Sequence, residues 1–274
     1  MSIYLGQLGR LVELKCPASL QVTPEDRYSF QTTAEGKVRG QVRPSLGRRV
    51  WSLGTSDATT PRDQGAIMAF ANGEWGPGPF VFVPADAPVM NMLSPEAASC
   101  APGAFTAGSG TAVGEAGPLN LGTDGWAGRS YSNNGAGTVF FGAEKVPVLQ
   151  GGKVTVSAYV LGAGAIARIA WYDAAGGSLG STSSAIMATA GTVTRSWVTA
   201  TPPAGAASAY ACAVNATAMA RPALTWTDTL LDWADGQGCP KAVLHAPSRS
   251  LVMASSDPRG GRYSNLSFTV QEVG

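Results

Sequence analysis

The sequence predicts an all-β fold in two parts: a discontinuous β-sandwich or β-barrel domain, and a jelly-roll β-sandwich inserted into it. One observation behind this prediction is the abundance of turn formers, 35 Gly and 18 Pro among 274 residues, without a collagen-like period. Another is a series of short segments rich in Val, Thr, Tyr and Trp, which recur about every 12 to 20 residues in the second half. The last segment also resembles the first in composition, whereas the middle is rich in Ala, Gly, Ser and Thr.

The stretch Trp75–Ser94 separates the two parts. It contains several Gly and Pro residues, and each Pro lacks a backbone donor and favours extended backbone before it, so no helix can bridge the stretch. We expect residues 1–94 and 239–274 to form one domain together, because two closing strands cannot fold alone. Residues 95–238 then form the inserted sandwich.

In the first part, a Thr60 cap followed by a proline predicts a helix that ends at Asn72-Gly73. Strands are predicted at Tyr28–Thr32, Val50–Leu53 and Phe80–Val83. Residues 1–14 fit either a short helix or extended structure, because Gly6 and Gly9 weaken an apolar spacing that would otherwise favour a helix.

In the inserted part, residues 101–125 are small and polar, which predicts an exposed loop or weak strands. Asp173–Gly177 predicts a hairpin turn, and Asp257–Gly261 predicts another between two closing strands. The strands predicted after residue 125 share a high content of β-branched and aromatic residues. They are Val139–Phe141, Lys153–Val160, Ala165–Trp171, Ser196–Thr199, Ala209–Val214 and Leu224–Leu231, and the closing part adds Val243–His245, Ser250–Met253 and Tyr263–Val273.

Composition excludes several classes of protein. Charged residues make up 14% of the chain and the net charge is +1, which argues against an electrostatic nucleic-acid partner. No stretch reaches the roughly 20 uninterrupted apolar residues of a membrane span, and the N-terminus has neither the basic nor the apolar region of a signal peptide. We therefore expect a soluble protein that is made in the cytosol, or that leaves it by a route without a cleaved signal, and no membrane insertion.

The four cysteines, Cys16, Cys100, Cys212 and Cys239, include no CxxC pair, so a zinc site is not expected. Cys100 and Cys239 lie at the two ends of the predicted insertion. A disulfide between them is one alternative, and four reduced, buried thiols are the other.

The sequence offers no catalytic constellation. His245 is the one histidine, and its position in a strand among apolar neighbours predicts a structural role. Gly108-Ser-Gly110-Thr-Ala-Val-Gly114 is not a dinucleotide fingerprint, and no metalloprotease, Walker A or EF-hand motif occurs. A pair of glycosidase carboxylates has few candidates in the insertion. We expect a protein that is not an enzyme.

Aromatic residues are the insertion's main chemical feature. They are Trp126, Tyr131, Tyr159, Trp171, Tyr172, Trp197, Tyr210, Trp226 and Trp233. Sugar rings stack on such side chains, while Asn and Asp bind the hydroxyls. The candidate carbohydrate-binding residues are therefore Asp124, Trp126, Tyr131, Asn133 and Asn134 in one loop-like stretch, and Trp171 and Tyr172 beside the Asp173 turn. The alternative is that these rings are core, most of all Tyr159 and Trp197.

Two further sites are candidates. The one basic concentration has no acid within it, which is typical of a solvated strand face, of a subunit interface or of a rim that faces a polyanion. Its residues are Lys37, Arg39, Arg43, Arg48 and Arg49. No cofactor is expected, except that Asp228 or Asp232 is a candidate ligand of a structural calcium.

The insertion resembles carbohydrate-binding-module-like jelly rolls of family 4/9. The resembling residues are Gly125-Trp126, Val146–Gly151 leading into Val154–Val160, Ala170–Asp173, Trp197 with Pro203–Ala206, and Asp228–Leu231. They extend over about half of the chain.

The flanking segments resemble tail proteins of long-tailed phages, particularly those that infect actinobacteria. The resembling residues are Arg48–Trp51, Phe70–Phe80, Pro84–Pro95 and Tyr263–Gly274, and their order is the strongest part of the likeness.

The second resemblance implies a distal-tail (Dit-like) hub protein of the virion. Such a protein forms a ring, expected to be a hexamer, which joins the tail tube to other tail-tip proteins at the tail tip of the virion after assembly in the host cytoplasm. A closed ring uses head-to-tail interfaces, which suits one basic surface. The inserted domain would face outward, toward host-wall glycan. The alternative is a carbohydrate-binding adhesin without a ring, and a wall-degrading hydrolase is the third hypothesis.

Overall fold

The structure is a computed structural model, and it describes residues 2–15, 19–24, 28–42, 48–54, 60–108, 111–134, 137–254 and 262–273. Arg43, Cys16 and the turn predicted at Asp257–Gly261 lie outside the described residues. The chain forms two compact units. The first comprises Met1–Gly6, Val12–Phe82 and Lys241–Gly274, and the second comprises Gln7–Leu11 and Val83–Pro240. The chain is nearly all β, as the sequence predicts.

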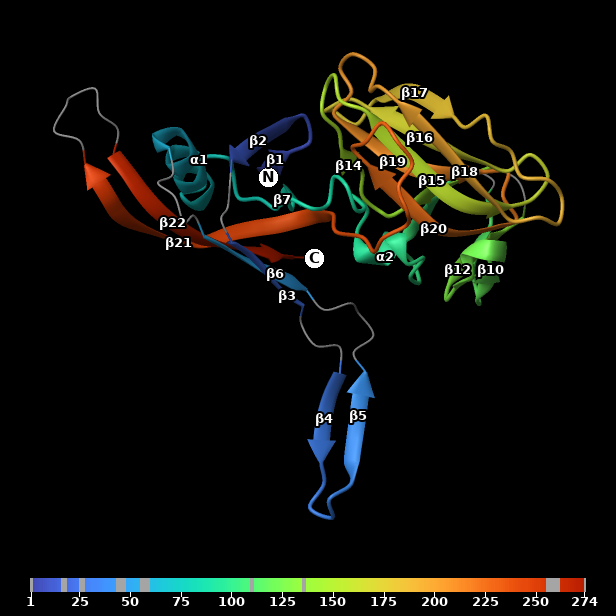
Figure 1. The fold of residues 1–274 in the computed structure, drawn as a ribbon, viewed down its shortest axis with the longest axis horizontal. Helices are drawn as coiled ribbons and strands as arrows, with labels where there is room; N and C mark the ends of the chain where they lie inside the picture. The colour runs from blue at the N-terminus through green and yellow to red at the C-terminus, as the bar shows by residue number, and fades with distance from the viewer. Residues whose placement is uncertain are drawn as a thin grey trace. The chain divides into compact units, whose positions relative to one another are not determined.

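The first unit is built on one sheet of seven strands in the order β2-β1-β7-β21-β22-β6-β3 (Figure 1). Its strands are β1 (Ser2–Gln7), β2 (Arg10–Lys15), β3 (Ser19–Pro24), β6 (Arg49–Gly54), β7 (Phe80–Val83), β21 (Cys239–Ala254) and β22 (Arg262–Glu272). Within the described residues this sheet is open, with β2 and β3 at its edges, so the barrel alternative is wrong. The opening residues are extended rather than helical.

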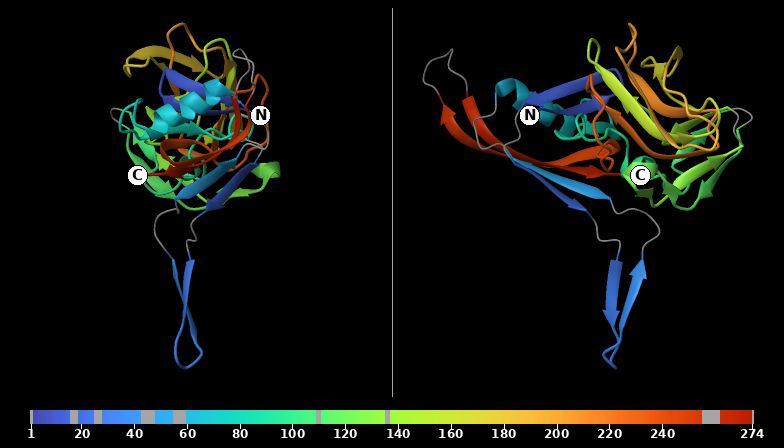
Figure 2. Two further views of the ribbon diagram at one scale, coloured as in Figure 1. Left: turned by 90° about the vertical axis from the view of Figure 1, so that its left-hand side faces the viewer. Right: turned by 45° about the vertical axis from the view of Figure 1, so that its right-hand side comes forward.

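The last two strands complete a sheet begun at the other end of the chain. β22 pairs antiparallel with β6, which in turn pairs with β3. Figure 2 shows this from two sides, with the closing strands in red beside the blue strands of the opening segment. The two predicted strands Val243–His245 and Ser250–Met253 are one long strand, β21, whose pairing with β22 shifts register between His245 and Ser248 and again between Leu251 and Met253.

Helix α1 (Pro61–Ala71) confirms the capping prediction. The Thr60 hydroxyl accepts a hydrogen bond from the Asp63 backbone N–H at 3.3 Å, and Asn72 ends the helix. Phe70 is buried and lies edge-on to Phe80 at 5.0 Å between ring centroids. The helix is therefore held by its apolar side as well as by its caps.

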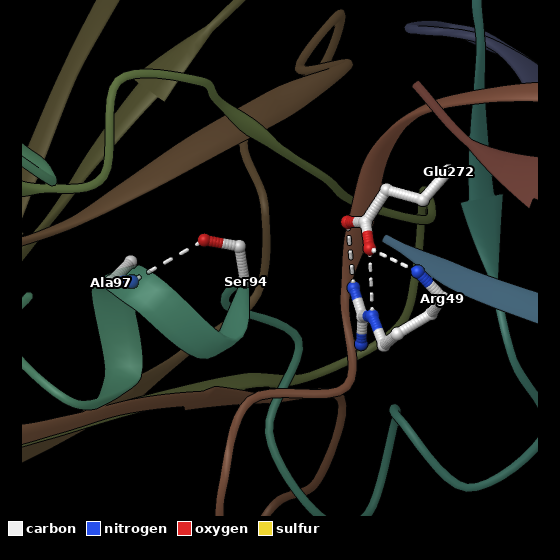
Figure 3. A network of polar contacts seen from close by, with 4 residues as sticks. All are labelled: Arg49, Ser94, Ala97 and Glu272. Atoms are coloured by element: carbon white, nitrogen blue, oxygen red, sulfur yellow. Dashed lines mark hydrogen bonds and ion pairs between the residues drawn. The ribbon is translucent and has the colours of Figure 1, made fainter. Parts of the chain in front are cut away.

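A buried ion pair joins β6 to the end of β22. The Arg49 guanidinium donates from Nε and Nη2 to the two carboxylate oxygens of Glu272, both at 2.9 Å (Figure 3). The same guanidinium lies 4.8 Å from the centroid of the buried Trp51 ring. This bidentate geometry ties the closing strand to the first part of the chain.

The second unit contains two stacked antiparallel sheets (Figure 1). The β15 sheet has the order β18-β15-β20-β12-β9, and the β16 sheet has the order β17-β16-β19-β13-β8, with β14 also paired to β19. The strands are β8 (Phe105–Ala107), β9 (Val113–Ala116), β12 (Ser130–Asn133), β13 (Thr138–Phe141), β14 (Val146–Pro147), β15 (Val154–Leu161), β16 (Ile166–Tyr172), β17 (Ser178–Ser183), β18 (Thr194–Ala200), β19 (Ser208–Val214) and β20 (Ala218–Thr225). A separate pair, β10 (Leu119–Asn120) and β11 (Trp126–Ala127), flanks the short helix η1 (Gly122–Asp124), and helix α2 (Pro95–Ala98) is capped by Ser94 (Figure 3).

Most strands predicted for this unit are confirmed, and so is the turn at Asp173–Gly177, where the two residues exchange hydrogen bonds. The strand predicted at Leu224–Leu231 is wrong from Trp226 onward. β20 ends at Thr225, and the Trp226 backbone N–H donates instead to the Pro88 carbonyl at 2.8 Å. β17 was not predicted, because its sequence, Ser-Leu-Gly-Ser-Thr-Ser, has no apolar alternation.

Asn91, in the part of the Trp75–Ser94 joint that belongs to the second unit, bonds to other segments of that unit. Its side chain is completely buried, and its amide nitrogen donates to the carbonyls of Pro222 at 3.1 Å and Ala234 at 3.0 Å. Its amide oxygen accepts from the backbone N–H groups of Leu93 at 3.2 Å and Leu224 at 3.1 Å. One side chain thus makes four buried bonds to three separate segments.

Candidate functional site

The exposed ring of Trp126 is held on a fixed backbone. Its side chain is 62% exposed, although the neighbouring Ala127 is buried. The Arg221 guanidinium donates to the backbone carbonyls of Asp124 at 3.2 Å and Trp126 at 2.8 Å. The Tyr159 hydroxyl donates to Asp124 Oδ2 at 2.6 Å, and burial together with this bond raises the pKa of Tyr159 to about 12. Two of the predicted sugar-binding residues, Asp124 and Trp126, therefore lie together.

Tyr131 does not belong to that group. Its side chain is fully buried between the two sheets, and its hydroxyl donates to the carbonyls of Ala101 at 2.7 Å and Ala104 at 3.0 Å. Burial raises the pKa of its phenol well above the usual value. The prediction that Tyr131 offers a ring to a ligand is wrong, because the inward face of β12 places it in the core. Asn133 and Asn134 lie at the end of the same strand, half-buried and exposed respectively.

Trp171 is also a core residue. It is 2% exposed, and its indole Nε1–H donates to the Thr182 hydroxyl at 3.0 Å. Tyr172 follows it on the same strand and therefore points to the opposite face of the sheet. The predicted pair is thus divided: Trp171 packs inside the sandwich, and Tyr172 lies on the outer face of the β16 sheet.

Three half-buried aromatic rings from three strands lie next to one another on this outer face. Tyr210 of β19 is edge-on to Tyr172 of β16, with ring centroids 5.7 Å apart and planes at 88°. Phe140 of β13 lies on its other side at 5.2 Å. The pairing explains the grouping, since Ala170 opposes Tyr210 and Cys212 opposes Phe140. We call Phe140, Tyr172 and Tyr210 the aromatic row.

Polar groups fix the row from the side. The Tyr210 hydroxyl donates to the Ala143 carbonyl at 2.9 Å, and the Lys145 ammonium lies 4.5 Å from the centroid of the Tyr172 ring. Burial raises the pKa of both Tyr172 and Tyr210, so both phenols remain neutral hydroxyls near neutral pH. The arrangement offers flat apolar surface beside hydroxyl and ammonium donors, which suits the alternating C–H faces and hydroxyls of a sugar.

Sequence reasoning found only Tyr172 of this row as a site residue. Tyr210 was one of several aromatic residues in predicted strands, and Phe140 stands next to Phe141, which is fully buried. The parity of each strand position decides which ring faces outward, and an apolar run such as Val139–Phe141 does not reveal that parity.

The basic residues do not form a single surface. Arg49 is buried against Glu272 and Trp51, so it stabilises its own sheet and is not exposed for a neighbour. Lys37 and Arg39 are exposed on a two-stranded ribbon, in which β4 (Tyr28–Thr32) pairs with β5 (Val38–Val42). The Lys37 Nζ atom lies 3.7 Å from Glu35 Oε2. Arg48 is exposed beside β6.

The predicted metal ligands, the described cysteines and His245 lie as follows. Among the described residues, no group of three or more His, Cys, Asp or Glu side chains could hold a metal ion, and Asp228 and Asp232 are exposed. Cys100, Cys212 and Cys239 are buried thiols, so the Cys100–Cys239 disulfide alternative is wrong. His245 lies in β21 as predicted, but its side chain is exposed rather than packed among apolar neighbours. The described part of the chain contains no helix long and apolar enough to cross a membrane.

No protein-family model matches the chain, and no curated protein matches it significantly. Among solved structures, it is similar to the enzymatically active domain of tailspike protein 4 from bacteriophage CBA120, with 13% identity over 45% of this chain and 19% of that one and a TM-score of 0.34. It is also similar to the CBM22-1 and GH10 modules of endo-1,4-β-D-xylanase 10B from Clostridium thermocellum complexed with xylohexaose, with 13% identity over 48% of this chain and 27% of that one and a TM-score of 0.31.

A third similar structure is the infectious bursal disease virus subviral particle, with 10% identity over 100% of this chain and 68% of that one and a TM-score of 0.23. The matched region thus covers about a fifth of the tailspike chain and about a quarter of the xylanase chain. Similarity at these TM-scores does not identify a function.

Proposed function

We propose that this chain is a non-catalytic, glycan-binding component of a phage virion, and that the outer face of the β16 sheet is its binding surface. The observation that supports glycan binding is the aromatic row, in which Tyr172, Tyr210 and Phe140 come together from three strands beside the Lys145 ammonium. Their ring contacts and the Tyr210 bond to the Ala143 carbonyl hold the row in place before a ligand arrives, which lowers the entropic cost of binding.

Binding to purified bacterial wall polysaccharides, measured by affinity electrophoresis, tests this proposal. Loss of one stacking ring costs about 1.5 kcal/mol, so Tyr172→Ala and Tyr210→Ala should each weaken binding about tenfold. Trp126→Ala is the matched control, because that ring is exposed elsewhere on the second unit and is expected to leave binding unchanged. Loss of binding in Trp126→Ala alone would assign the site to the Asp124–Trp126 loop and overturn the proposed surface. Near-ultraviolet circular dichroism of each variant controls for folding.

A tail-ring role for the first unit is the second part of the proposal. It is supported by the resemblance of the flanking segments to phage tail proteins and by the β4–β5 ribbon. Within the described residues these two strands pair only with each other, and Val38 is 64% exposed. An isolated two-stranded ribbon is at best marginally stable in water, so a neighbouring subunit that covers it would stabilise it.

Light scattering of the purified chain at several concentrations tests the ring. The proposal predicts a discrete oligomer, and the resemblance to distal-tail proteins implies six copies. The double variant Val38→Ser, Arg39→Ser should have a smaller mass in solution. The matched control is Ser181→Ala, an exposed change on β17 that should leave the mass unchanged. A strictly monomeric wild-type protein would contradict self-assembly and would favour the adhesin alternative. An adhesin without a ring would lack the avidity that several linked binding sites provide.

A further inference from the structure

Arg168 stands on the same outer face as the aromatic row, four residues before Tyr172 on β16. Strand alternation places both side chains on one face, about 13 Å apart at ~3.3 Å per residue. Arg168 is half-buried and opposes Cys212 on β19 and Ser183 on β17. It thus lies at one end of the surface, while Lys145 lies at the other.

The Arg168 guanidinium is oriented but not neutralised by the protein. Its Nε–H donates to the Ser183 hydroxyl at 3.0 Å, which fixes the plane of the group. Within the described part of the chain, no carboxylate makes an ion pair with it. Its two terminal nitrogens therefore remain donors for a ligand.

Small side chains lie between Arg168 and the aromatic row in the pairing of the described strands. The side chains that separate it from Phe140 and Tyr210 are Cys212 and Ala170, which are small and buried. Phe140 lies two strands away, about 10 Å across the sheet at ~4.8 Å per strand. On this face of the described sheet, Arg168 on one side and Phe140 and Tyr210 on the other are thus separated by small side chains.

A planar guanidinium with two free donors binds an oxyanion by two parallel hydrogen bonds, which a neutral hydroxyl cannot match. We infer that the surface takes an anionic glycan, and that Arg168 determines specificity by binding a carboxylate carried by one sugar while a neighbouring sugar lies on the aromatic row. This inference rests on the proposed glycan-binding function and adds the chemical class of the ligand. A phosphate ester would satisfy the same donors, and the experiment separates the two anions.

The probes are acidic polysaccharides of bacterial walls and capsules. Each is used before and after reduction of its carboxyl groups to neutral alcohols, and phosphate-bearing polymers are used before and after dephosphorylation. Wild-type protein should bind the carboxylate form about ten- to a hundredfold more tightly than its reduced partner at low salt. Arg168→Gln should abolish this preference and keep the weaker binding to the reduced form. Arg168→Lys should keep part of this preference, because an ammonium keeps the charge but cannot make the two parallel hydrogen bonds of a guanidinium. Lys153→Gln, which removes an exposed cation bonded to Thr201, is the charge-matched control and should behave as wild type.

Equal binding of the carboxylate and reduced forms, or a preference that survives Arg168→Gln, would overturn the inference. The effect of Tyr172→Ala on binding would still test the aromatic row independently. A preference only for phosphate-bearing polymers would assign Arg168 to phosphate and overturn the carboxylate assignment. Absence of binding to every polymer would overturn the proposed function itself, which is a different result from loss of selectivity.

Discussion

Replacing Asn91 by alanine should destabilise the second unit more than any other single polar substitution in it. The side chain is fully buried and makes four hydrogen bonds, two as donor and two as acceptor. Its partners are all backbone groups, from the joint itself, from β20 and from the segment after β20. Alanine would leave the Ala234 carbonyl and two N–H groups without this partner, while the Pro222 carbonyl would keep its bond from the Trp233 indole N–H at 3.3 Å.

The size of the effect follows from the three groups that would lose their partner. Each buried backbone group left without a partner costs roughly 1–3 kcal/mol, which gives about 3 kcal/mol at the low end of that range. A water molecule that enters the space left by the amide would recover part of this cost. We therefore expect a loss of about 3–5 kcal/mol, or roughly 6–20 °C in the melting temperature of a unit of this size.

Urea denaturation followed by tryptophan fluorescence measures this loss, because Trp226 and Trp233 lie in the segment that Asn91 holds and each donates its indole N–H to a carbonyl. The matched control is Asn120→Ala. That side chain is exposed and accepts one hydrogen bond, from the Gly122 backbone N–H at 2.9 Å, so its loss should cost less than about 1 kcal/mol. A change below about 1 kcal/mol in Asn91→Ala would refute the role assigned to Asn91.

Three further predictions concern buried groups. Tyr131→Phe removes a hydroxyl that donates to two loop carbonyls and should lower the free energy of unfolding by about 1–2 kcal/mol, and an unchanged urea midpoint would contradict this. Arg49→Leu leaves the largely buried Glu272 carboxylate with the residue 49 backbone N–H but without the guanidinium, and should cost about 3 kcal/mol. A double variant with Glu272→Leu should cost less, and equal losses would contradict the coupling. Burial raises the pKa of the Cys100 and Cys212 thiols from 9.0 to about 12, so the folded state keeps protons that the unfolded chain releases. Their contribution to stability is therefore complete below about pH 9 and falls as pH rises toward 12. In urea titrations at rising pH, the free energy of unfolding should fall less steeply for the variant in which both cysteines are replaced by alanine than for the wild type.

Much of the fold could be predicted from local chemistry. The cap at Thr60, the turn at Asp173–Gly177 and the β-branched and aromatic content of the predicted strand Lys153–Val160 each act over a few residues, and the helix, turn and strand form there. The end of β20 could not be predicted in this way, because the Pro88 carbonyl, more than a hundred residues away, takes the Trp226 N–H and draws the chain off the sheet.

The candidate site was harder to predict because it depends on strand parity. Trp171 and Tyr172 are adjacent in sequence and equally suited to stacking, yet one is core and the other lies on the outer face. Tyr131 carries the same ambiguity. Arg168 is the clearest omission, since nothing in its local sequence signals that it shares a face with rings from β13 and β19. Only the register between strands brings these residues together.

Hydrogen–deuterium exchange of the full chain, with and without an acidic wall polysaccharide, tests the central claim most directly. The proposed surface predicts slower exchange on binding in peptides that cover β13, β16, β19 and the Ala143–Lys145 turn, while β15 and β18 in the other sheet remain unchanged. Slower exchange confined to residues 119–127 would place the ligand at Trp126 and contradict the account. A ligand that slows exchange in none of these segments would contradict glycan binding by this unit altogether.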